Sequence, residues 1–224
     1  MATDRQLSKE FIKRRINSAI INKEILPGDR IVETRLARQL NVSQSPVREA
    51  LNDLEHMGVV ETIPYRGCFV KGISHKDMIN SYKLRKSFEV MVIEEVVGSV
   101  SKKALDPIRN PMQKMLDSAE KDDFESYISF DTIFHRDIMM LSDNDMLIRM
   151  WDRCDFQEWT RIGTAISGED LITLAKRHEA LYVALNEGNR QQAVLESRKH
   201  WNFLIDMVEN EMSKSQKKNE QEKS

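Results

Sequence analysis

An aspartate and three histidines in the second half of the chain are residue types that bind transition metals. Asp131 and His135 are one helical turn apart, so their side chains project side by side. His178 and His200 each fall within an apolar helical stripe. Because a buried imidazole or carboxylate is costly without a partner, we interpret the four residues as one metal site. Imidazole and carboxylate ligands suit zinc, which is the first candidate, and also nickel, manganese or iron.

Three helices must bring these side chains together. A helical period predicts helices over residues 122–142, 168–187 and 189–213, with a turn at Gly188 between the last two. At the helical rise, His178 lies about 14 Å before this turn and His200 roughly 17 Å into the following helix. In an antiparallel hairpin the two imidazoles therefore reach about the same level. The alternative is that each of the four is a separately satisfied core residue.

A second group of chemically useful residues lies in the first quarter of the chain. Ser45 and Pro46 suit the start of a helix, and Gly58 suits the left-handed position after its end. A shorter helix over residues 33–40 and a turn over residues 41–43 precede it, which is the layout of a DNA-reading helix-turn-helix. An ordinary pair of packed helices is the alternative. The apolar stripe of the second helix is Val47, Ala50, Leu51 and Leu54. The candidate DNA-contacting residues are Thr34, Arg35, Ser43, Gln44, Ser45 and Arg48.

The flanking segments predict the other parts of a winged helix. Ser8 can cap a first helix, whose buried stripe is Ile12, Ile16, Ala19 and Ile20. Val59 to Val70 has the pattern of a β-hairpin with Arg66 and Gly67 at its tip. A basic residue beside a glycine suits insertion along a DNA groove, because glycine lets the backbone approach closely. A solvated turn is the alternative for this tip.

The whole chain is therefore predicted to be mainly α-helical, with two domains. An N-terminal winged helix-turn-helix of three helices and a hairpin wing occupies residues 1–72, and residues 73–76 form a linker. An all-α antiparallel helical bundle follows over residues 77–212, and residues 213–224 form a disordered tail without apolar residues. The bundle helices are predicted over residues 75–99, 104–120, 122–142, 144–162, 168–187 and 189–213. Their breaks are expected near Gly98, Pro107, Pro111, Gly163, Gly168 and Gly188.

Charge and cysteine usage agree with this division. The formal net charge is −2, but residues 1–76 contain 13 Lys and Arg against 9 Asp and Glu, and the remainder is acidic. A basic first domain favours DNA binding by that domain. Cys68 and Cys154 lie far apart without metal or redox spacing, which is typical of reduced cytosolic thiols. No apolar run approaches the roughly 20 residues of a membrane span, so we expect a cytoplasmic protein without a membrane segment.

Pro27 to Val60 closely resembles the winged-helix signature of GntR-type bacterial transcription regulators. The matching positions are Pro27, Gly28, Leu36, Ala37, Val42, Ser43, Pro46 to Leu51 and Gly58. The match is long and gapless, with one departure: the family usually has arginine where this chain has Gln44. The resemblance implies a winged helix that binds DNA.

The second domain resembles the FCD ligand domain of FadR-like GntR regulators, in its metal-binding subset. The spacing Asp-x3-His, followed by two helical histidines, carries this resemblance, and the family's ligands fall on Asp131, His135, His178 and His200. The resemblance implies a metal at the base of a cavity that binds a small effector, commonly a carboxylate. Arg85 resembles an arginine near the start of the family's first ligand-domain helix, and Arg161 follows an apolar stripe. Both are candidate effector contacts, because a guanidinium can hold a carboxylate with two hydrogen bonds; the alternative places them on the surface.

These observations predict a ligand-controlled DNA-binding repressor, or less often an activator, and not an enzyme. We expect it to act as a homodimer on a palindromic operator in double-stranded DNA, with a small carboxylate effector and a divalent metal. One alternative is a metal-dependent enzyme such as a hydrolase, although four protein ligands leave less room than a catalytic zinc site needs. The other alternative is an effector-independent DNA-binding protein with a structural metal.

Overall fold

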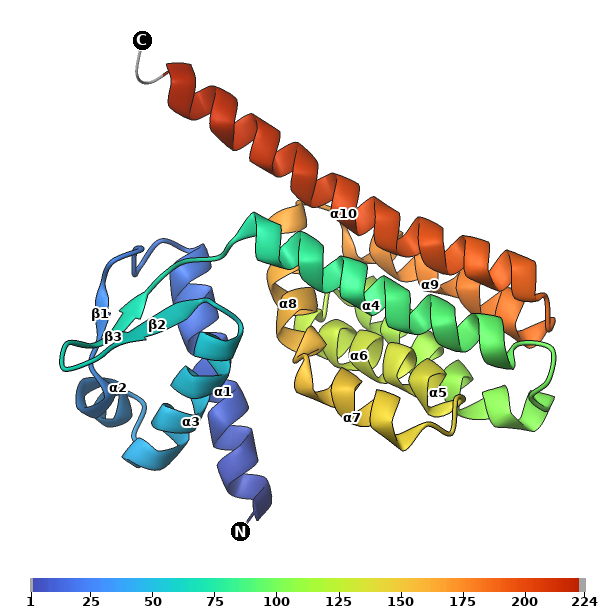
Figure 1. The fold of residues 1–224 in the computed structure, drawn as a ribbon, viewed down its shortest axis with the longest axis horizontal. Helices are drawn as coiled ribbons and strands as arrows, with labels where there is room; N and C mark the ends of the chain where they lie inside the picture. Colours follow the sequence, from blue (N-terminus) through green and yellow to red (C-terminus); the bar gives the residue numbers. More distant parts are fainter. Residues whose placement is uncertain (1, 222–224) are drawn as a thin grey trace. The chain divides into compact units, whose positions relative to one another are not determined.

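The computed structural model describes the backbone of residues 2–221 and the side chains of residues 9–210. Within this range the chain divides into two compact units, with the boundary between Asp77 and Met78. The division falls beside the predicted linker 73–76, of which His75 and Lys76 already belong to a helix of the second unit. Figure 1 labels the helices and strands of both units, which are described separately below.

The first unit combines three helices with a small sheet. Its elements are α1 (Ala2–Ile21), β1 (Arg30–Ile31), α2 (Glu33–Gln39), α3 (Gln44–His56), β2 (Val60–Ile63) and β3 (Gly67–Val70). The strands are antiparallel in the order β1-β3-β2, and Glu61 lies opposite Phe69. The predicted stripes of α1 and α3 form the core, since Ile12, Val47 and Leu54 are fully buried. The winged helix-turn-helix architecture is confirmed.

The second helix of the helix-turn-helix, α3, begins earlier than we predicted. α3 starts at Gln44, with Ser43 in the extended N-cap position, whereas Ser45 was expected to be the cap. The Ser45 hydroxyl instead donates to Glu49 one turn later, at 3.2 Å. Gly58 follows the helix with φ of 74°, the left-handed conformation predicted from its position.

The hairpin differs from the prediction at its tip and in its partner strand. The turn is formed by residues 64–66, and Tyr65 has the left-handed φ of 62°, while Gly67 is already the first residue of β3. The hairpin also pairs with β1, which we did not predict because two residues are too short to show a strand period. Arg30 thereby lies opposite Phe69 beside the wing.

The second unit is an all-helical bundle. Its helices are α4 (His75–Val96), α5 (Lys102–Glu120), α6 (Phe124–Met140), α7 (Asp145–Arg153), α8 (Phe156–Ser167), α9 (Leu171–Asn186) and α10 (Arg190–Gln221). The segment 144–162, predicted to be one helix, is two: Cys154 ends α7, and Asp155 turns the chain with φ of 47°. This turn packs the Trp151 and Phe156 rings against each other with centroids 4.6 Å apart.

Glycine ends some helices of the bundle as predicted, but other expected breaks are wrong. Gly98, Gly168 and Gly188 have positive φ beside helix ends, where a residue without a Cβ atom fits best. The other three expected breaks lie inside helices, at Pro107, Pro111 and Gly163. Gly163 fills a packing role, because a Cβ atom there would lie 1.8 Å from the Tyr82 hydroxyl oxygen.

The last helix continues through most of the predicted tail. α10 runs to Gln221, although we expected disorder from Ser213; residues 222–224 lie outside the described part. The extension is rich in Lys, Glu and Gln, which have high helix propensity even without an apolar face to pack. Within the described residues, no helix is both long enough and apolar enough to cross a lipid bilayer.

Candidate functional site

The predicted DNA-contacting residues of α2 and α3 are exposed. Thr34, Arg35, Ser43, Gln44, Ser45 and Arg48 all have exposed side chains. Arg48 stands in the first two turns of α3 with 66% of its side chain accessible. Its Nε donates to a Glu33 carboxylate oxygen at 2.6 Å, and a terminal nitrogen donates to Gln44 Oε1 at 3.4 Å. These contacts link the start of α2 to the start of α3.

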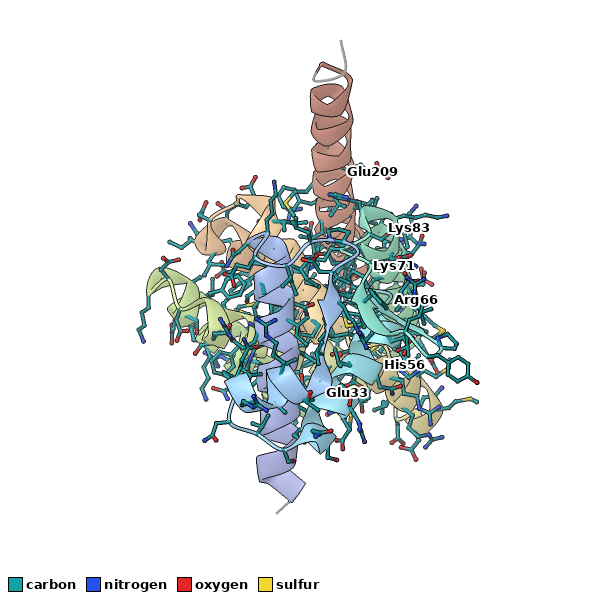
Figure 2. The ribbon with its side chains drawn as sticks, turned by 90° about the vertical axis from the view of Figure 1, so that its left-hand side faces the viewer. Glu33, His56, Arg66, Lys71, Lys83 and Glu209 are labelled. Atoms are coloured by element: carbon teal, nitrogen blue, oxygen red, sulfur yellow. The ribbon has the colours of Figure 1, made fainter. Side chains whose placement is uncertain are left out.

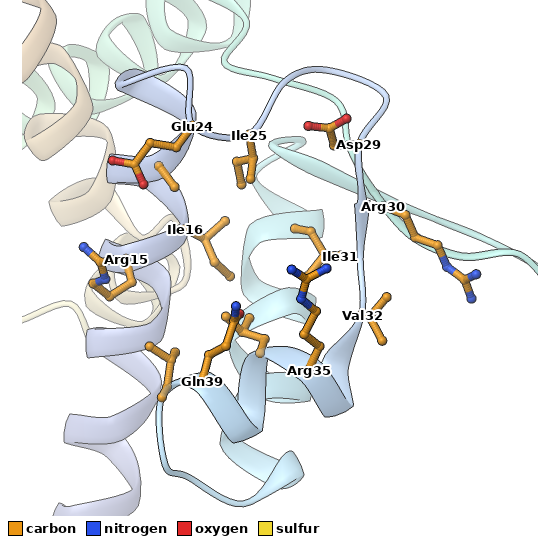
Figure 3. A pocket seen from close by; sticks show the side chains of 13 residues that line it. Arg15, Ile16, Glu24, Ile25, Asp29, Arg30, Ile31, Val32, Arg35 and Gln39 are labelled. Atoms are coloured by element: carbon orange, nitrogen blue, oxygen red, sulfur yellow. The ribbon is translucent and has the colours of Figure 1, made fainter.

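Arg35 lies beside a hollow in the same unit. A cavity of about 630 Å³ between α1, β1 and α2 has an apolar floor that includes Ile16 and Leu36. Figure 3 shows Arg35 and Gln39 directed from α2 toward this space, whereas Arg30 points away from it. Arg35 therefore lines this cavity, whereas the hydrogen bonds of Arg48 go to Glu33 and Gln44.

The structure places further polar and aromatic residues beside the two that we predicted at the tip of the wing. Arg66 is exposed and lies over the Phe69 ring at 5.8 Å, and Figure 2 shows it on the same unit as Glu33. The guanidinium of Arg30 packs against Gly67, since a Cβ atom at that glycine would lie 3.1 Å from Arg30 Nε. Tyr65 is fully exposed at the tip. Arg30 and Tyr65 join the predicted pair as candidate DNA contacts.

In the second unit, the four predicted metal ligands lie together in the bundle core. Asp131 and His135 come from α6, His178 from α9 and His200 from α10, and none is more than 4% exposed. The ring nitrogens of the three histidines include one atom each within 4.8 Å of one another. His178 Nε2 lies 3.2 Å from His135 Nε2 and 3.0 Å from Asp131 Oδ1. His135 Nε2 lies 3.8 Å from the same oxygen.

Neighbouring groups hold the other nitrogens of two of these rings. His178 Nδ1 donates to the backbone carbonyl of Leu174 at 3.1 Å. His135 Nδ1 donates to the carboxylate of Glu89, a fully buried residue of α4. The second oxygen of Glu89 accepts from the Ser197 hydroxyl at 2.6 Å and from the Trp201 indole at 3.0 Å. Hydrogens on both Nδ1 atoms leave both Nε2 atoms with lone pairs, which face each other.

His200 differs from the other two histidines. Its ring lies 4.4 Å from that of His178 and 5.1 Å from that of His135, between centroids. Neither of its buried ring nitrogens has a hydrogen-bond partner among the described residues.

A buried arginine completes the carboxylate side of the cluster. Arg85, four residues before Glu89 on α4, donates to Asp131 Oδ2 at 3.1 Å and to the Thr160 hydroxyl. Its guanidinium carbon lies 4.6 Å from the centre of the Trp201 ring. Arg85 is 1% exposed, so the surface alternative is wrong for this residue.

These contacts shift the ionisation of the cluster. Burial alone would raise the pKa of Asp131, but the Arg85 guanidinium beside it holds that pKa below its ordinary range. Burial lowers the pKa of His135 despite the nearby Glu89 carboxylate. Burial also lowers the pKa of His200 well below its usual value, with the other two rings adding to the effect. Neutral His135 and His200 rings beside an ionised Asp131 are the protonation states that bind a metal.

The residues present fit a divalent transition metal. Tetrahedral bonds of about 2.0 Å to nitrogen and oxygen place ligand atoms about 3.3 Å apart. The 3.0 and 3.2 Å separations around His178 Nε2 are close to that spacing. Facing lone pairs on His135 and His178 repel each other unless a cation or a proton lies between them. The unpartnered nitrogens of His200 add a third donor to the set.

Arg161, the second predicted effector contact, lies elsewhere in the bundle. It is 5% exposed, and its guanidinium binds Glu158 at 3.2 Å and the carboxylate of Glu125. It also lies over the Phe124 ring at 5.9 Å. The structure thus places the two arginines in different polar clusters, with Arg85 alone touching a predicted metal ligand.

Sequence reasoning missed Glu89 and Trp201. Glu89 carried a usable signal, since it follows Arg85 by four residues on the face of α4 that is otherwise apolar. Two charged residues on a buried helix face indicate a polar partner across the core. Trp201 had no such signal, because an aromatic residue beside His200 is ordinary core composition.

Two known protein-family models match two consecutive parts of the chain. The family model described as bacterial regulatory proteins, gntR family, matches residues 8–70, and the FCD domain matches residues 80–203, more than half of the chain. A probable D-xylose utilization operon transcriptional repressor of Paenarthrobacter nicotinovorans is 26% identical over 196 residues, covering 86% of each chain.

Solved structures share the fold. The E. coli McbR/YncC structure has a TM-score of 0.66 at 20% identity, covering 92% of this chain and 98% of that one. An FCD domain described as metal-free has a TM-score of 0.50 at 16% identity, covering 63% and 99%. With both family models matched in order along it, the chain belongs to the GntR family of bacterial regulators and carries an FCD domain, so it is a DNA-binding transcription regulator and not an enzyme.

Proposed function

We propose that this regulator is a homodimeric repressor whose binding to a palindromic operator is controlled by a small carboxylate at a metal site in the FCD domain. The repressor name of the Paenarthrobacter relative supports the direction of control. A single winged helix reads only a few base pairs, and two-fold symmetry doubles the contact, which favours a dimer on a symmetric site.

Operator reading is assigned to the start of α3 and to the wing. Arg48 and Gln44 are exposed side chains that can reach base edges, and Thr34, Ser43 and Ser45 offer hydroxyls to phosphates. Arg66 and Gly67 of the wing contact the backbone or a groove, as does Arg35 if the DNA passes its cavity. The exposure of these side chains supports the assignment.

The metal proposal rests on one observation, the convergence of unsatisfied lone pairs in the core. Asp131, His135, His178 and His200 would hold the ion, while Glu89 and the Leu174 carbonyl fix two of the rings. A bound ion would supply a Lewis acid for a carboxylate oxygen of the effector. Zinc suits this donor set best, and nickel, manganese or iron also fit it.

Arg85 supports a carboxylate effector because its guanidinium already binds the Asp131 carboxylate inside the cluster. A carboxylate of the effector that reached Arg85 would meet a planar guanidinium, which can bind a carboxylate through two parallel hydrogen bonds. Arg161 serves the same ligand only if the Glu125 and Glu158 contacts open. We therefore rank Arg85 before Arg161 as an effector contact.

The test begins with genomic DNA fragments retained by the purified protein, followed by footprinting and fluorescence anisotropy. We expect two symmetric half-sites, and an operator affinity that changes at least tenfold when a small carboxylate is added to zinc-loaded protein. His178→Ala should keep DNA binding and lose both the metal and the carboxylate response.

Two results would overturn parts of the proposal. A monomer protecting one unrepeated half-site would remove the dimer. An operator affinity that ignores every carboxylate tested, while the metal still raises the melting temperature, would favour the effector-independent protein with a structural metal.

A further inference from the structure

The third histidine of the cluster lacks the partner that the other two possess. His135 donates to Glu89, and His178 donates to the Leu174 carbonyl. A histidine that binds a metal through one nitrogen almost always donates its other N–H to an acceptor. His200 has no such acceptor among the described residues, although both of its nitrogens are buried.

His200 also lines a surface hollow. A cavity of about 270 Å³ lies between α9 and α10, and its lining residues are Lys176, Arg177, Ala180, Glu196, Lys199 and His200. The lining contains three cationic side chains and one acidic one. The volume suits an ion or a small organic acid and not a macromolecule.

The cationic side chains of this hollow form only some of the hydrogen bonds that they can donate. Lys199 Nζ binds Glu196 at 2.8 Å, and Gln192 also donates to that carboxylate. Arg177 stacks on the Phe203 ring at 3.8 Å and donates one terminal nitrogen to the Lys199 carbonyl. Its Nε is buried without a partner within the described part of the chain. Arg177 and His200, each with a buried nitrogen that has no partner among the described residues, therefore both line this hollow.

We propose that this hollow, the α9–α10 groove, is a second anion site that binds a small carboxylate and is coupled to the metal centre through His200. Arg177 and the two lysines supply the donors and positive charge, and the ligand completes the polar surroundings of the His200 ring. The lining residues of the groove include neither Arg85 nor Asp131, which bind each other in the polar cluster described above. The coupling, though not the anion binding, rests on the metal proposal above.

The test uses succinate, a weak chelator, as the probe. In metal-free full-length protein, isothermal titration should detect succinate binding that weakens at least tenfold in the double variant Lys176→Gln/Lys199→Gln. Both lysines are exposed, so the variant should fold. The matched control is Lys102→Gln/Lys103→Gln, which removes two exposed lysines from α5 and should bind succinate like the wild type. Equal affinity in all three proteins, or no binding by the wild type, would overturn the anion site.

Coupling is read from metal affinity, measured by chelator competition with and without saturating succinate. The wild type and the control should show a change of at least threefold, and the groove variant should show none, because two linked sites alter each other equally. A change that persists in the groove variant would mean that succinate acts directly at the metal, which refutes coupling through the groove. Absence of metal binding would refute the metal proposal, while the metal-free titration would still decide the anion site.

Discussion

Replacing Glu89 with glutamine should separate the positioning of His135 from the stability of the bundle. The Glu89 Oε1 atom accepts from Ser197 and Trp201, and a glutamine oxygen can keep both bonds. The glutamine nitrogen then stands where the other carboxylate oxygen faced His135 Nδ1. Because two N–H groups cannot hydrogen-bond to each other, the His135 proton should move to Nε2, the atom that the metal needs.

The expected magnitudes differ between the two readouts. In metal-free protein a charge-assisted bond, worth about 1.5–3 kcal/mol, becomes a neutral one worth roughly 0.5–1.5 kcal/mol, so the free energy of unfolding should fall by only about 1–1.5 kcal/mol. Metal binding must first restore the original tautomer. Loss of a partner of a metal-binding histidine typically costs about 10–100-fold in affinity, which is roughly 1.4–2.8 kcal/mol.

Chelator competition measures the metal affinity, and urea denaturation of metal-free protein measures the stability. The matched control is Glu94→Gln, an exposed glutamate of the same helix that binds Arg198 at 3.3 Å, and neither quantity should change appreciably. If Glu89→Gln binds zinc as tightly as the wild type, the tautomer argument is wrong. A large loss of stability with unchanged metal affinity would make Glu89 a structural residue only.

The same substitution should change the pH dependence of stability. Burial would raise the pKa of Glu89, but the His135 ring and the hydrogen bonds from His135, Ser197 and Trp201 bring it below its ordinary 4.5. The carboxylate therefore adds stability that is present above pH 4.5 and is lost as the pH falls through the lower folded-state pKa. Urea midpoints of the wild type should fall more steeply than those of Glu89→Gln below pH 4.5.

Three further predictions concern the DNA-reading surface and the packing of α8. Arg48→Ala should weaken operator binding at least tenfold in anisotropy titrations while the melting temperature stays nearly unchanged, because the side chain is largely exposed. A marked fall in the melting temperature would mean that Arg48 stabilises the fold. Gln44→Arg should shift the base preference at one half-site position from adenine to guanine by about 1–3 kcal/mol in random-DNA selection, and identical consensus sites would remove Gln44 from base reading. Gly163→Ala should destabilise the protein by about 1–3 kcal/mol in urea, and adding Tyr82→Phe should recover part of the loss, because the added methyl group meets the Tyr82 hydroxyl; a neutral Gly163→Ala would contradict this account.

The elements that sequence predicted best are those with long periodic patterns. The stripe of α3 and the left-handed Gly58 follow from local chemistry, and both appear in the structure. The break between α7 and α8 could not be predicted from helix-breaking residues, because the chain turns at Asp155, where there is neither glycine nor proline. The helix breaks that we expected at Pro107 and Pro111 are absent, and both prolines lie inside α5.

The sequence predicted which residues form the metal-ligand cluster, but not their hydrogen-bond partners. Asp131 and His135 on one stripe, with His178 and His200 on two others, suffice to place four polar groups in one core. The partners of these groups depend on which helices are neighbours in space, and no local pattern of α4 states that Glu89 faces His135. Periodicity gives the face of a helix, whereas the identity of the opposing helix comes only from the assembled bundle.

The contacts between α4 and α6 set the register of these two helices. Arg85 meets Asp131, and Glu89 meets His135, so two pairs one turn apart follow the same order along both helices. A slip by one turn, about 5.4 Å, would bring the Glu89 carboxylate toward that of Asp131 in a buried core. Sliding is therefore strongly opposed. Because α4 begins at the boundary between the two units, these two pairs fix against α6 the helix that directly follows the winged helix.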